Sequence, residues 1–457
     1  MRPSRVLAAP FVLCAMLLVL AAPASAQTFR DLIDFTDSSF GDPEYVTLAQ
    51  SRSGDLYGTT AAAPLTGLGE IFGATTGGKV IMGYDNFDYD NGYHPGGGVT
   101  LAANGLLYGT VTYSLGMSGV IYSITPEGFY TVLYQFDALT GSYPYAPPIQ
   151  GSDGNFYGTS DGYPHGLPST IYQYQPQTGV VTLLHSFGKE VALYYALTQG
   201  IDGDLYGVAS TGGPNKFGSI IRLSKAGVLR YVYEFPGGSG GSYPVGPLVQ
   251  LSDGNFYGVA ENGGTASAGF VFKMTPSGTV STVYNFTGNP QSGFPSNGLT
   301  LGSDGQLYGV SYSGGTFDDG TIYRISPSGQ YTLLYSFSSR ADTLAALTQH
   351  TNGTFYGMSV DGGANDFGMM YSLNVNLKPF ISFVQPQGGT GQIEQILGQG
   401  LTGATSVTFS GVPASSFTIV SDTFMTAVVP SGASTGLIVV TTPTGALTSN
   451  KSFQIIP

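Results

Sequence analysis

The sequence predicts an all-β protein whose main part is a seven-bladed β-propeller, followed by a small β-sandwich. Three observations predict this fold. A tripeptide recurs seven times at nearly constant spacing, each copy lies within the same order of turns and strand-like runs, and the pattern changes after residue 376. The chain also contains 69 glycines, 31 tyrosines and 27 phenylalanines but only 9% charged residues. This composition favours short strands joined by tight turns.

The first 26 residues have the pattern of a secretory signal peptide. Arg2 and Arg5 supply a positive start, residues 6–22 an apolar stretch, and Ala24-Ser25-Ala26 a small-residue cleavage motif. Prolines within and after the stretch shorten it below the ~20 residues that a membrane-spanning helix needs, which argues against the alternative of an uncleaved anchor. We therefore expect cleavage after Ala26 and a mature protein that is secreted, or held at the cell surface, without membrane insertion.

The expected mature chain is acidic and has no thiol chemistry. Cys14, the single cysteine, lies in the predicted signal peptide, so neither disulfides nor thiolate zinc ligands are expected. Loss of the two arginines of that segment changes the formal net charge from −13 to −15. Such a charge argues against nucleic acid or an anionic membrane as a partner. It favours a soluble extracellular protein, which we expect to be a monomer.

The repeat is marked by the tripeptide Leu/Phe-Tyr-Gly. Its tyrosine stands at Tyr57, Tyr108, Tyr157, Tyr206, Tyr257, Tyr308 and Tyr356. Successive copies are 48 to 51 residues apart, a period typical of propeller and solenoid repeats. This regular spacing therefore indicates a repeat architecture.

One complete unit runs from Phe294 to Phe337 and predicts four strands. An Asp-Gly turn separates the first two strands, a Gly-Gly loop follows the second, and a Pro-x-Gly turn joins the last two. Asp-Gly supplies the positive φ that two-residue hairpins need. The fourth strand is apolar on both faces at Leu333-Leu334-Tyr335, as expected of a sheet that neighbours cover on both sides. Four antiparallel strands in a unit of this length are typical of a propeller blade.

The two ends of the repeat region predict a closed ring. The seventh unit ends with its third strand at residues 369–375, and the mature chain begins with a strand-like segment, 29–35, that aligns with the fourth strand of other units. The N-terminal strand should therefore complete the last blade and leave no partial blade unpaired. An open solenoid, the alternative architecture, has no need of this permutation. The propeller is thus predicted over residues 27–376.

The repeat pattern resembles a known family. Its motifs are Tyr-Pro, Asp-Gly-Asn-Phe-Tyr-Gly, Gly-Gly, Ile-Tyr, Thr/Ser-Pro-x-Gly and Leu-Tyr-x-Phe. They are similar to the GloVer (Gloeobacter/Verrucomicrobia-type) tandem repeat of exported bacterial proteins over about residues 28–375. This resemblance implies an exported repeat protein and says little about its function.

Residues 379–457 follow a different pattern. After a Lys378-Pro379 linker, short β-branched runs are separated by Gly and Pro at intervals of about 8–12 residues, as in an antiparallel sandwich. The whole stretch resembles an IPT/TIG domain. That resemblance implies an immunoglobulin-like fold that serves as a spacer or as a second contact for a partner.

The predicted topology places a candidate binding site on one face of the ring. The tight Asp-Gly and Pro-x-Gly turns share one face, whereas the longer Gly-Gly loops and Tyr-Pro connections share the other, which we call the loop face. Its candidate binding residues are Tyr93, His94, Tyr143, Tyr163, His165, Tyr243 and Phe294, with Tyr145 and Phe317 as further aromatic residues. Aromatic rings stack on sugars and on apolar side chains. The alternative is that the repeated Tyr-Pro segments only pack the connections between blades.

One acidic loop predicts a cation site. Asn86, Asp88 and Asp90 place oxygen ligands at alternate positions, which Ca²⁺ accepts. The distant bidentate glutamate of an EF-hand is missing, so a solvated acidic loop is the alternative interpretation. No other cofactor is expected.

The sequence favours a binding protein and leaves catalysis open. The histidines occupy different positions in the repeat, and no nucleophile elbow or phosphate-binding loop is recognisable. A loop-face histidine with a nearby acid such as Asp161 would be the acid–base pair to seek. We predict a secreted bacterial, non-enzymatic binding or cell-surface-associated protein, with polysaccharide or another surface protein as partner. The alternatives are an extracellular polysaccharide-active enzyme, a lyase or glycoside hydrolase, and a purely structural envelope component.

Overall fold

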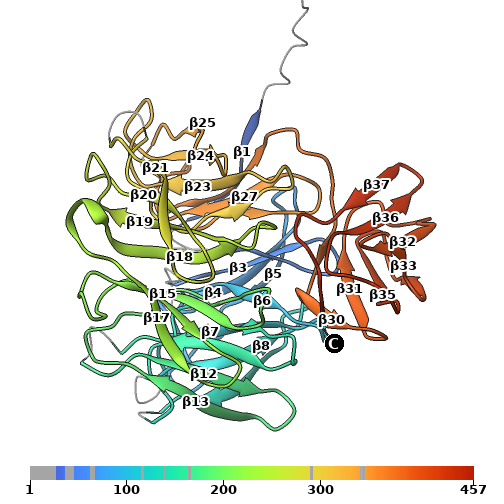
Figure 1. The fold of residues 1–457 in the computed structure, drawn as a ribbon, viewed down its shortest axis with the longest axis horizontal. Helices are drawn as coiled ribbons and strands as arrows, with labels where there is room; N and C mark the ends of the chain where they lie inside the picture. Colours follow the sequence, from blue (N-terminus) through green and yellow to red (C-terminus); the bar gives the residue numbers. More distant parts are fainter. Residues whose placement is uncertain are drawn as a thin grey trace, which may run out of the picture.

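The computed structural model describes most of the chain beyond the predicted signal peptide. The described residues are 27–36, 46–61, 67–114, 118–137, 139–162, 166–288, 292–339, 341 and 345–456. Tyr163, His165 and the whole predicted signal peptide lie outside them. Within these ranges the protein is all-β (Figure 1), and one 3₁₀ turn at Gly238–Gly240 is the sole helical element. None of the helical structure in these ranges is long or apolar enough to cross a membrane.

Sheets of four antiparallel strands follow one another along the repeats. We number them in chain order, and in sheets 1 to 6 the strands pair in sequence. Sheet 1 contains β2 (Ala49–Gln50), β3 (Leu56–Thr60), β4 (Glu70–Ala74) and β5 (Val80–Tyr84). Sheet 2 contains β6 (Val99–Leu101), β7 (Leu107–Val111), β8 (Val120–Ile124) and β9 (Tyr130–Gln135). Sheet 3 contains β10 (Ile149–Gln150), β11 (Phe156–Ser160), β12 (Thr170–Gln175) and β13 (Val180–Ser186).

The next three sheets repeat this order. Sheet 4 contains β14 (Thr198–Gln199), β15 (Leu205–Ala209), β16 (Ser219–Leu223) and β17 (Leu229–Glu234). Sheet 5 contains β18 (Ser242–Gln250), β19 (Phe256–Asn262), β20 (Phe270–Met274) and β21 (Val280–Asn285). Sheet 6 contains β22 (Thr300–Leu301), β23 (Leu307–Ser311), β24 (Thr321–Ile325) and β25 (Tyr331–Ser336). The predicted four-stranded unit is therefore observed in each of these repeats.

Sheet 7 joins the two ends of the repeat region. Its strand order is β1-β28-β27-β26. These strands are β1 (Thr28–Asp34), β26 (Thr348–Gln349), β27 (Phe355–Ser359) and β28 (Met369–Asn374). The antiparallel pairing of β1 with β28 runs from Thr28 opposite Asn374 to Asp34 opposite Met369, which confirms that the N-terminal strand completes the last unit.

Hydrogen bonds also close the circuit between sheet 7 and sheet 1. The Thr348 hydroxyl donates to the Leu48 carbonyl at 2.7 Å, and the Thr351 backbone N–H donates to Gln50 Oε1 at 3.0 Å. Last and first sheets are thus neighbours in space, although about 300 residues separate these partners in the sequence. The described repeat region is therefore propeller-like.

Sheet 6 shows why Tyr-Gly recurs in the repeat. The Tyr308 hydroxyl donates to the Asp304 carboxylate at 2.9 Å and so ties the Asp-Gly turn to the second strand. The following residue, Gly309, lies against the ring of Tyr323 on the third strand, where a Cβ atom would stand 2.5 Å from Tyr323 Cζ. The glycine is therefore needed because the buried ring occupies the space of a side chain.

Burial decreases from the middle strands of each sheet to the fourth strand. In sheet 2, β7 and β8 are buried along their whole length, whereas β9 is half-buried or exposed. Val132 is 39% exposed and Leu333 is 41% exposed. The prediction that the fourth strand is covered on both faces is therefore wrong at these positions. The fourth strand is the edge opposite the first strand, and neighbouring sheets cover it less completely.

A glutamine at the end of several first strands links one sheet to the next. The Gln199 side chain donates to the Gly203 carbonyl of its own turn at 3.2 Å and accepts the backbone N–H of Ser152 at 3.1 Å. In the next sheet, Gln250 accepts the backbone N–H of Ile201 at 2.7 Å. These bonds satisfy backbone groups of the turns and hold the first strands beside one another.

The segment after the repeats forms further sheets with their own core. One four-stranded sheet has the order β29-β31-β35-β34, a second has the order β33-β32-β36-β37, and β30 pairs in parallel with β38. The strands are β29 (Ser382–Phe383), β30 (Gln387–Gly389), β31 (Ile393–Leu397), β32 (Ser406–Phe409), β33 (Val412–Pro413), β34 (Phe417–Ile419), β35 (Phe424–Val428), β36 (Ile438–Thr442), β37 (Gly445–Thr448) and β38 (Gln454–Ile456). Ile396, Val407 and Phe453 are among the residues of the core that the sheets share.

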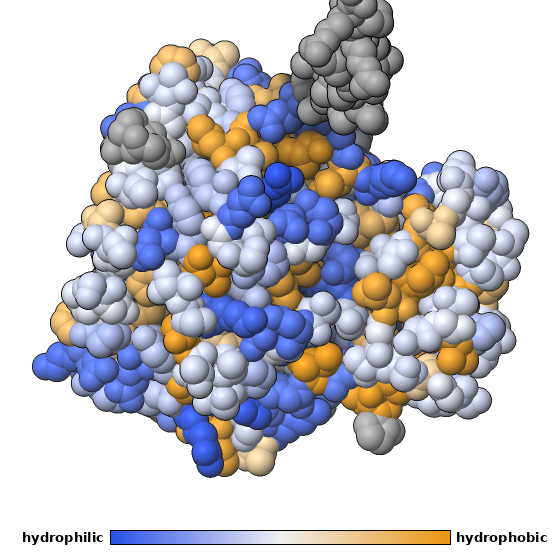
Figure 2. Space-filling view, turned by 45° about the horizontal axis from the view of Figure 1, so that its top comes forward, coloured by the Kyte–Doolittle hydropathy of each residue, from blue (hydrophilic) through white to orange (hydrophobic). Residues whose placement is uncertain are grey.

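The C-terminal sheets pack against the face of the ring that carries the Asp-Gly turns (Figure 1). Arg52, in the first such turn, donates to Gln395 Oε1 at 2.7 Å, and its guanidinium lies 4.6 Å from the centre of the Phe424 ring. Gln385 Nε2 donates to the Gly151 carbonyl, in the turn of sheet 3, at 3.3 Å. Figure 2 shows a group of apolar residues on the C-terminal part, near the repeats. The loop face is therefore the opposite face of the ring.

Candidate functional site

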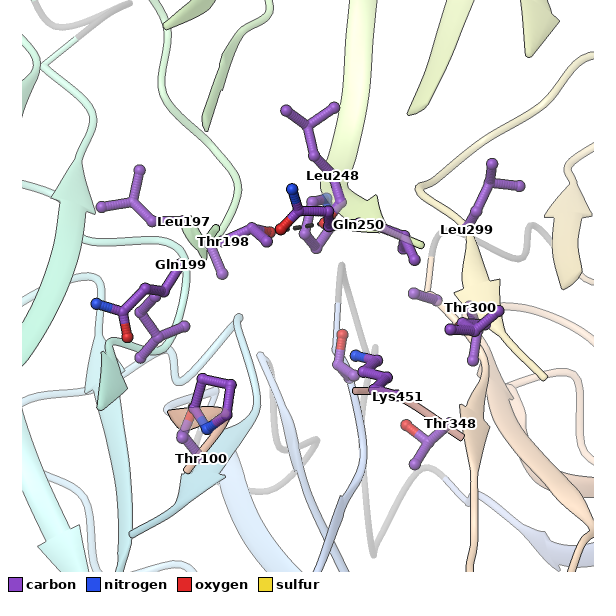
Figure 3. Close-up of a pocket in the computed structure, with 18 of the residues that line it drawn as sticks. Thr100, Leu197, Thr198, Gln199, Leu248, Gln250, Leu299, Thr300, Thr348 and Lys451 are labelled. Carbon is purple, nitrogen blue, oxygen red and sulfur yellow. Dashed lines mark hydrogen bonds between the residues drawn. The ribbon is translucent and has the colours of Figure 1, made fainter. Parts of the chain in front are cut away.

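A cavity of about 590 Å³ lies at the centre of the repeat region (Figure 3). Its wall comes from the first strand of each sheet, or from the residues just before that strand. This volume is within the range of roughly 300–1,000 Å³ that is typical of small-molecule sites. The ring of repeats thus surrounds a central space large enough for a ligand.

The wall of the cavity is uncharged and mixes hydroxyl, amide and aliphatic groups. Its residues include Thr100, Thr198, Thr300, Thr348, Gln199, Gln250, Leu197, Leu248 and Leu299. Some hydroxyls are already engaged: that of Thr198 donates to the Leu248 carbonyl of the next sheet at 2.7 Å. A ligand in this space would meet both polar and apolar surface.

Residues of the C-terminal segment form the floor of the cavity. Phe380, Phe383 and the stretch 450–452 belong to its lining. Asn450 Nδ2 donates to the Leu301 carbonyl at 3.4 Å and so connects this floor to sheet 6. Lys451 extends from the floor toward the centre of the ring (Figure 3). Two parts of the chain that are far apart in sequence therefore build one cavity.

An aromatic cluster lies on the loop face, beside the other end of the cavity. We define it as Tyr89, Tyr93, His94, Tyr113, Tyr143, Tyr145 and Tyr194. The Tyr93 and Tyr113 rings stack with centres 5.3 Å apart, and Tyr143 meets Tyr113 edge-on at 5.6 Å. Tyr145 meets Tyr194 edge-on at 5.7 Å. Tyr145 and Tyr194 also line the cavity, so the cluster and the cavity are continuous.

Hydroxyl groups connect the two halves of the aromatic cluster. A hydrogen bond joins the side chains of Tyr145 and Tyr113. Burial, together with the proximity of Tyr113 and Asp161, raises the pKa of Tyr145 above its usual value. The hydroxyl of Tyr145 therefore stays protonated at neutral pH and can donate hydrogen bonds.

The structure brings together three of the residues that the sequence proposed for binding. Tyr93, His94 and Tyr143 all contact Tyr113 through their rings, the His94 ring at 5.5 Å. Tyr243 and Phe294 lie elsewhere on the loop face: Tyr243 N donates to the Phe217 carbonyl, and Phe294 stacks on Tyr312 at 5.8 Å. Tyr163 and His165 fall outside the described residues, so their part in binding stays a prediction.

The Tyr-Pro connections hold an unusual backbone conformation. His94, Tyr143 and Tyr243 each precede a proline and have φ values of 68°, 59° and 57°. Non-glycine residues seldom adopt such angles. The proline after Tyr143 packs on Gly119, where a Cβ atom would stand 2.6 Å from the proline Cδ. The backbone of these segments thus packs the connections, as the alternative interpretation expected, and it also sets where the rings point.

Three residues of the site were missed by reasoning from the sequence. Tyr113 and Tyr194 complete the aromatic cluster, and Lys451 stands in the cavity. Tyr113 lies two residues after β7 and Tyr312 lies directly after β23, and an aromatic residue just beyond the second strand was the available signal. Lys451 lies outside the repeats, and no periodic signal marks it.

The predicted cation loop is held by its own hydrogen bonds. Asp88 Oδ1 accepts the backbone N–H groups of Asp90 at 2.9 Å and Asn91 at 2.7 Å, and Asn91 Nδ2 donates to the Asn86 carbonyl. No group of three or more His, Cys, Asp or Glu able to hold a metal was found in the described parts of the chain. Binding of Ca²⁺ by Asn86, Asp88 and Asp90 stays a prediction.

The described titratable groups near the loop face differ in their surroundings. Asp161 is buried, and its Oδ1 accepts hydrogen bonds from the Ser169 hydroxyl at 2.7 Å and the Leu193 N–H at 3.3 Å, which indicates a structural role. Glu70, at the start of β4, is half-buried. Its burial and the nearby Asp85 raise the pKa of Glu70 to about 7. Glu70 therefore changes protonation state near neutral pH.

The two other described histidines are structural. His350 is buried, its Nε2 donates to the Gly54 carbonyl at 2.9 Å, and its Nδ1 accepts the Asn352 N–H at 3.0 Å. Burial lowers the pKa of His350, and this pair of bonds suits the neutral ring. His185 packs on Phe187 with ring centres 4.5 Å apart. Both histidines thus have packing partners outside the cavity.

Comparisons with known proteins agree with this architecture. A model of the Gloeobacter/Verrucomicrobia repeat matches residues 22–199 and 193–420. Similar solved structures include a fungal alcohol oxidase of the AA5 family in complex with copper (13% identity, 94% of this chain and 99% of that chain covered, TM-score 0.51). An oligogalacturonate lyase from Vibrio parahaemolyticus is also similar (12% identity, 76% and 97% covered, TM-score 0.51). These likenesses show the fold alone. A search of the curated proteins found no match.

Proposed function

The chain belongs to the Gloeobacter/Verrucomicrobia repeat family, and on this premise we propose that it is a secreted, non-enzymatic saccharide-binding protein. In this proposal the repeats form a seven-bladed β-propeller and the C-terminal sheets an immunoglobulin-like domain of the IPT/TIG type. The succession of four-stranded sheets and the separate C-terminal core support these assignments. The signal-peptide pattern of residues 1–26 supports export.

The aromatic cluster at the end of the cavity is the observation that carries the proposal. Tyrosine rings offer flat apolar faces that pack against the C–H groups of sugar rings, and their hydroxyls bond to sugar hydroxyls. The stacked Tyr93 and Tyr113 are half-buried, and the exposed Tyr89 extends the cluster outward at 5.2 Å from Tyr93. Tyr145 and Tyr194 lead from these rings into the cavity. A saccharide chain would therefore meet aromatic rings first and the cavity second.

The wall of the cavity also suits a saccharide. Sugars present hydroxyl groups around a partly apolar ring, and the wall combines threonine and glutamine with leucine. We propose that the ligand lies across the aromatic cluster with one end in the cavity. The C-terminal sheets, on the opposite face, would then act as a spacer and as the floor.

The first experiment compares two tyrosines that lie just beyond the second strands of their sheets and stack on an aromatic neighbour. Tyr113 and Tyr312 each follow the second strand, and each stacks on an aromatic residue, Tyr93 and Phe294 respectively. We expect Tyr113→Ala to weaken saccharide binding by roughly 10-fold or more, by analogy with the stacking of a nucleobase on one aromatic ring, which contributes about 1–3 kcal/mol. The loss of binding is measured by affinity electrophoresis of residues 27–457 in gels that contain a panel of polysaccharides.

The control in this experiment is Tyr312→Ala, which removes a comparable ring outside the aromatic cluster. We expect Tyr312→Ala to migrate like the unchanged protein in every polysaccharide gel. Equal retardation of both variants, or equal loss in both, would contradict a binding site at the aromatic cluster. Far-UV circular dichroism of both variants checks that the sheets remain folded.

A second candidate function, that of a polysaccharide-active enzyme, is favoured by the Glu70–Asp85 pair. A carboxyl group with a pKa of about 7 beside a second acid is the arrangement that acid–base catalysis uses. Glu70 lies two residues after Leu68, whose carbonyl accepts the backbone N–H of His94. The backbone of Glu70 is therefore close to the aromatic cluster. Each gel lane is therefore assayed for released ends or unsaturated products. Product that disappears in Glu70→Gln, with binding retained, would establish this second function.

A further inference from the structure

Lys451 lines the central cavity, whereas the other described lysines and arginines do not. Among the described residues that line the central cavity, Lys451 is the sole charged one. It stands on the floor with its side chain directed into the open space between the first strands (Figure 3). More than a third of its surface is accessible to solvent, and the residue belongs to the lining of the cavity.

The ion pairs of the described chain all lie elsewhere. Arg222 pairs with Asp204 at 2.6 Å, and Lys273 pairs with Asp253 at 2.9 Å. These pairs join turns to third strands of the repeats. None of the described ion pairs includes Lys451, and no Asp or Glu belongs to the described lining of the cavity. Among the described residues of the lining, Lys451 thus shares the cavity with uncharged residues only.

The described lining offers this cation no anionic partner. Removing an ammonium group from bulk water disfavours its charged form unless an anion compensates it. The surroundings of Lys451 lower its pKa below the usual value, with burial as the cause. An anion that entered the cavity would restore the missing partner. The whole chain has 28 acidic and 15 basic residues. A described lining that contains a lysine and no acidic residue therefore differs in charge from the chain as a whole.

We propose that Lys451 binds the carboxylate of an acidic sugar residue, such as a uronic acid, at the end of a saccharide chain held by the aromatic cluster. This inference rests on the proposed function and names its substrate class. The chain enters from the loop face past Tyr145 and Tyr194, and its terminal residue reaches the floor. The hydroxyls of Thr198, Thr300 and Thr348, which donate to carbonyls of neighbouring sheets, can then accept hydrogen bonds from its hydroxyls. One ammonium group matches one carboxylate in charge, whereas phosphate sites generally use several donors or arginine.

The test measures binding of three matched oligosaccharide probes by isothermal titration calorimetry. Each probe has three residues: one ends in glucuronic acid, one in glucose, and one in a sulfated glucose. We expect the unchanged protein to bind the glucuronate-ended probe most tightly. Lys451→Met should weaken that binding by roughly 10- to 100-fold and leave the neutral probe unaffected, and Lys451→Arg should retain part of the preference. Lys189→Met, an exposed loop-face lysine outside the cavity lining, should behave like the unchanged protein.

A second measurement uses the unchanged protein. With ¹³C-labelled lysine, the Lys451 resonance is identified by its loss in Lys451→Arg, and its pKa is read by pH titration in NMR spectra. The glucuronate-ended probe should raise this pKa, and the neutral probe should leave it where it was. An unchanged pKa with saturating acidic probe would overturn the inference even if Lys451→Met proved unstable.

The outcomes separate this inference from the proposed function. Equal affinity for acidic and neutral probes, still lost in Tyr113→Ala, would keep saccharide binding and overturn the role of Lys451. Tighter binding of the sulfated probe would overturn the assignment of a carboxylate. Absence of binding by all three probes and by the polysaccharide panel would overturn both.

Discussion

At the residue scale, the repeat is explained by contacts between a glycine and an aromatic ring. Gly309 in sheet 6 lies where a Cβ atom would meet the ring of Tyr323. Tyr323 is fully buried, so it cannot swing away. The same contact recurs between Gly158 and Tyr172 in sheet 3. The glycine of Tyr-Gly on the second strand and the tyrosine of Ile-Tyr on the third are therefore both needed for the same contact.

The first prediction follows from this contact. Gly309→Ala should destabilise the protein by about 1–3 kcal/mol, because the added methyl group overpacks a filled core. Urea unfolding followed by tyrosine fluorescence gives the value. Gly77→Ala is the control, since a Cβ atom there would have no neighbour closer than 3.8 Å. Equal stabilities of the two variants would show that Tyr323 can adjust.

At the element scale, β1 is the strand that depends most on a distant partner. It pairs with β28 along its length, and its Phe29 ring stacks on Tyr335 of sheet 6 at 3.8 Å. β1 therefore contributes both to sheet 7 and to the contact between sheets 6 and 7. Without β1, the hydrogen-bonding groups of β28 would form an exposed edge, and strands of other protein molecules could pair with it.

The second prediction concerns removal of this strand. A protein that begins at residue 36 should unfold at lower urea concentration and should form oligomers in size-exclusion chromatography. Addition of a peptide covering residues 27–35 should restore the monomer, because the edge of β28 is again paired. A peptide with the same composition in scrambled order is the control. A truncated protein with unchanged stability would contradict the role assigned to β1.

At the scale of the whole molecule, the contact between ring and C-terminal sheets contains a buried acid. Glu394 on β31 is 3% exposed and lines a crevice that Ser152 and Asp153 of sheet 3 also line. Burial raises the pKa of Glu394 well above 4.5. The stabilising contribution of the neutral form is complete below about pH 4.5 and is lost as the pH rises through the raised folded-state pKa.

The third prediction is a pH dependence of stability. Glu394→Gln should raise the unfolding temperature at pH 8, since the amide removes the burial of a charge, and should change it little at pH 4.5. Differential scanning calorimetry at the two pH values measures the difference. Glu127→Gln, at an exposed turn, is the control. A larger effect of Glu394→Gln at the lower pH would reverse the sign argued here.

Features that recur in every repeat could be predicted from the sequence, whereas features that occur once could be predicted only in part. Turns and strands recur in every unit, so the four-stranded sheets and the pairing of β1 were predictable. The aromatic cluster was predictable only in part, because Tyr145 and Tyr194 belong to different units and meet through the curvature of the ring. Lys451 comes from outside the repeats, and its position depends on how the C-terminal sheets pack. The exposure of Leu333 was misjudged because apolar character alone does not show which strand is outermost.

The floor built by the C-terminal segment has a consequence for the stoichiometry of binding. Residues around Lys451 line the cavity on the side of the C-terminal segment, so a polysaccharide bound as proposed above would not pass through the ring and would be held at a chain terminus. The number of protein molecules held by a polysaccharide sample should then follow the number of chain ends rather than its mass. Shortening a polymer tenfold at constant mass should increase the capacity about tenfold, and sedimentation of protein with graded polymer lengths would count the bound molecules.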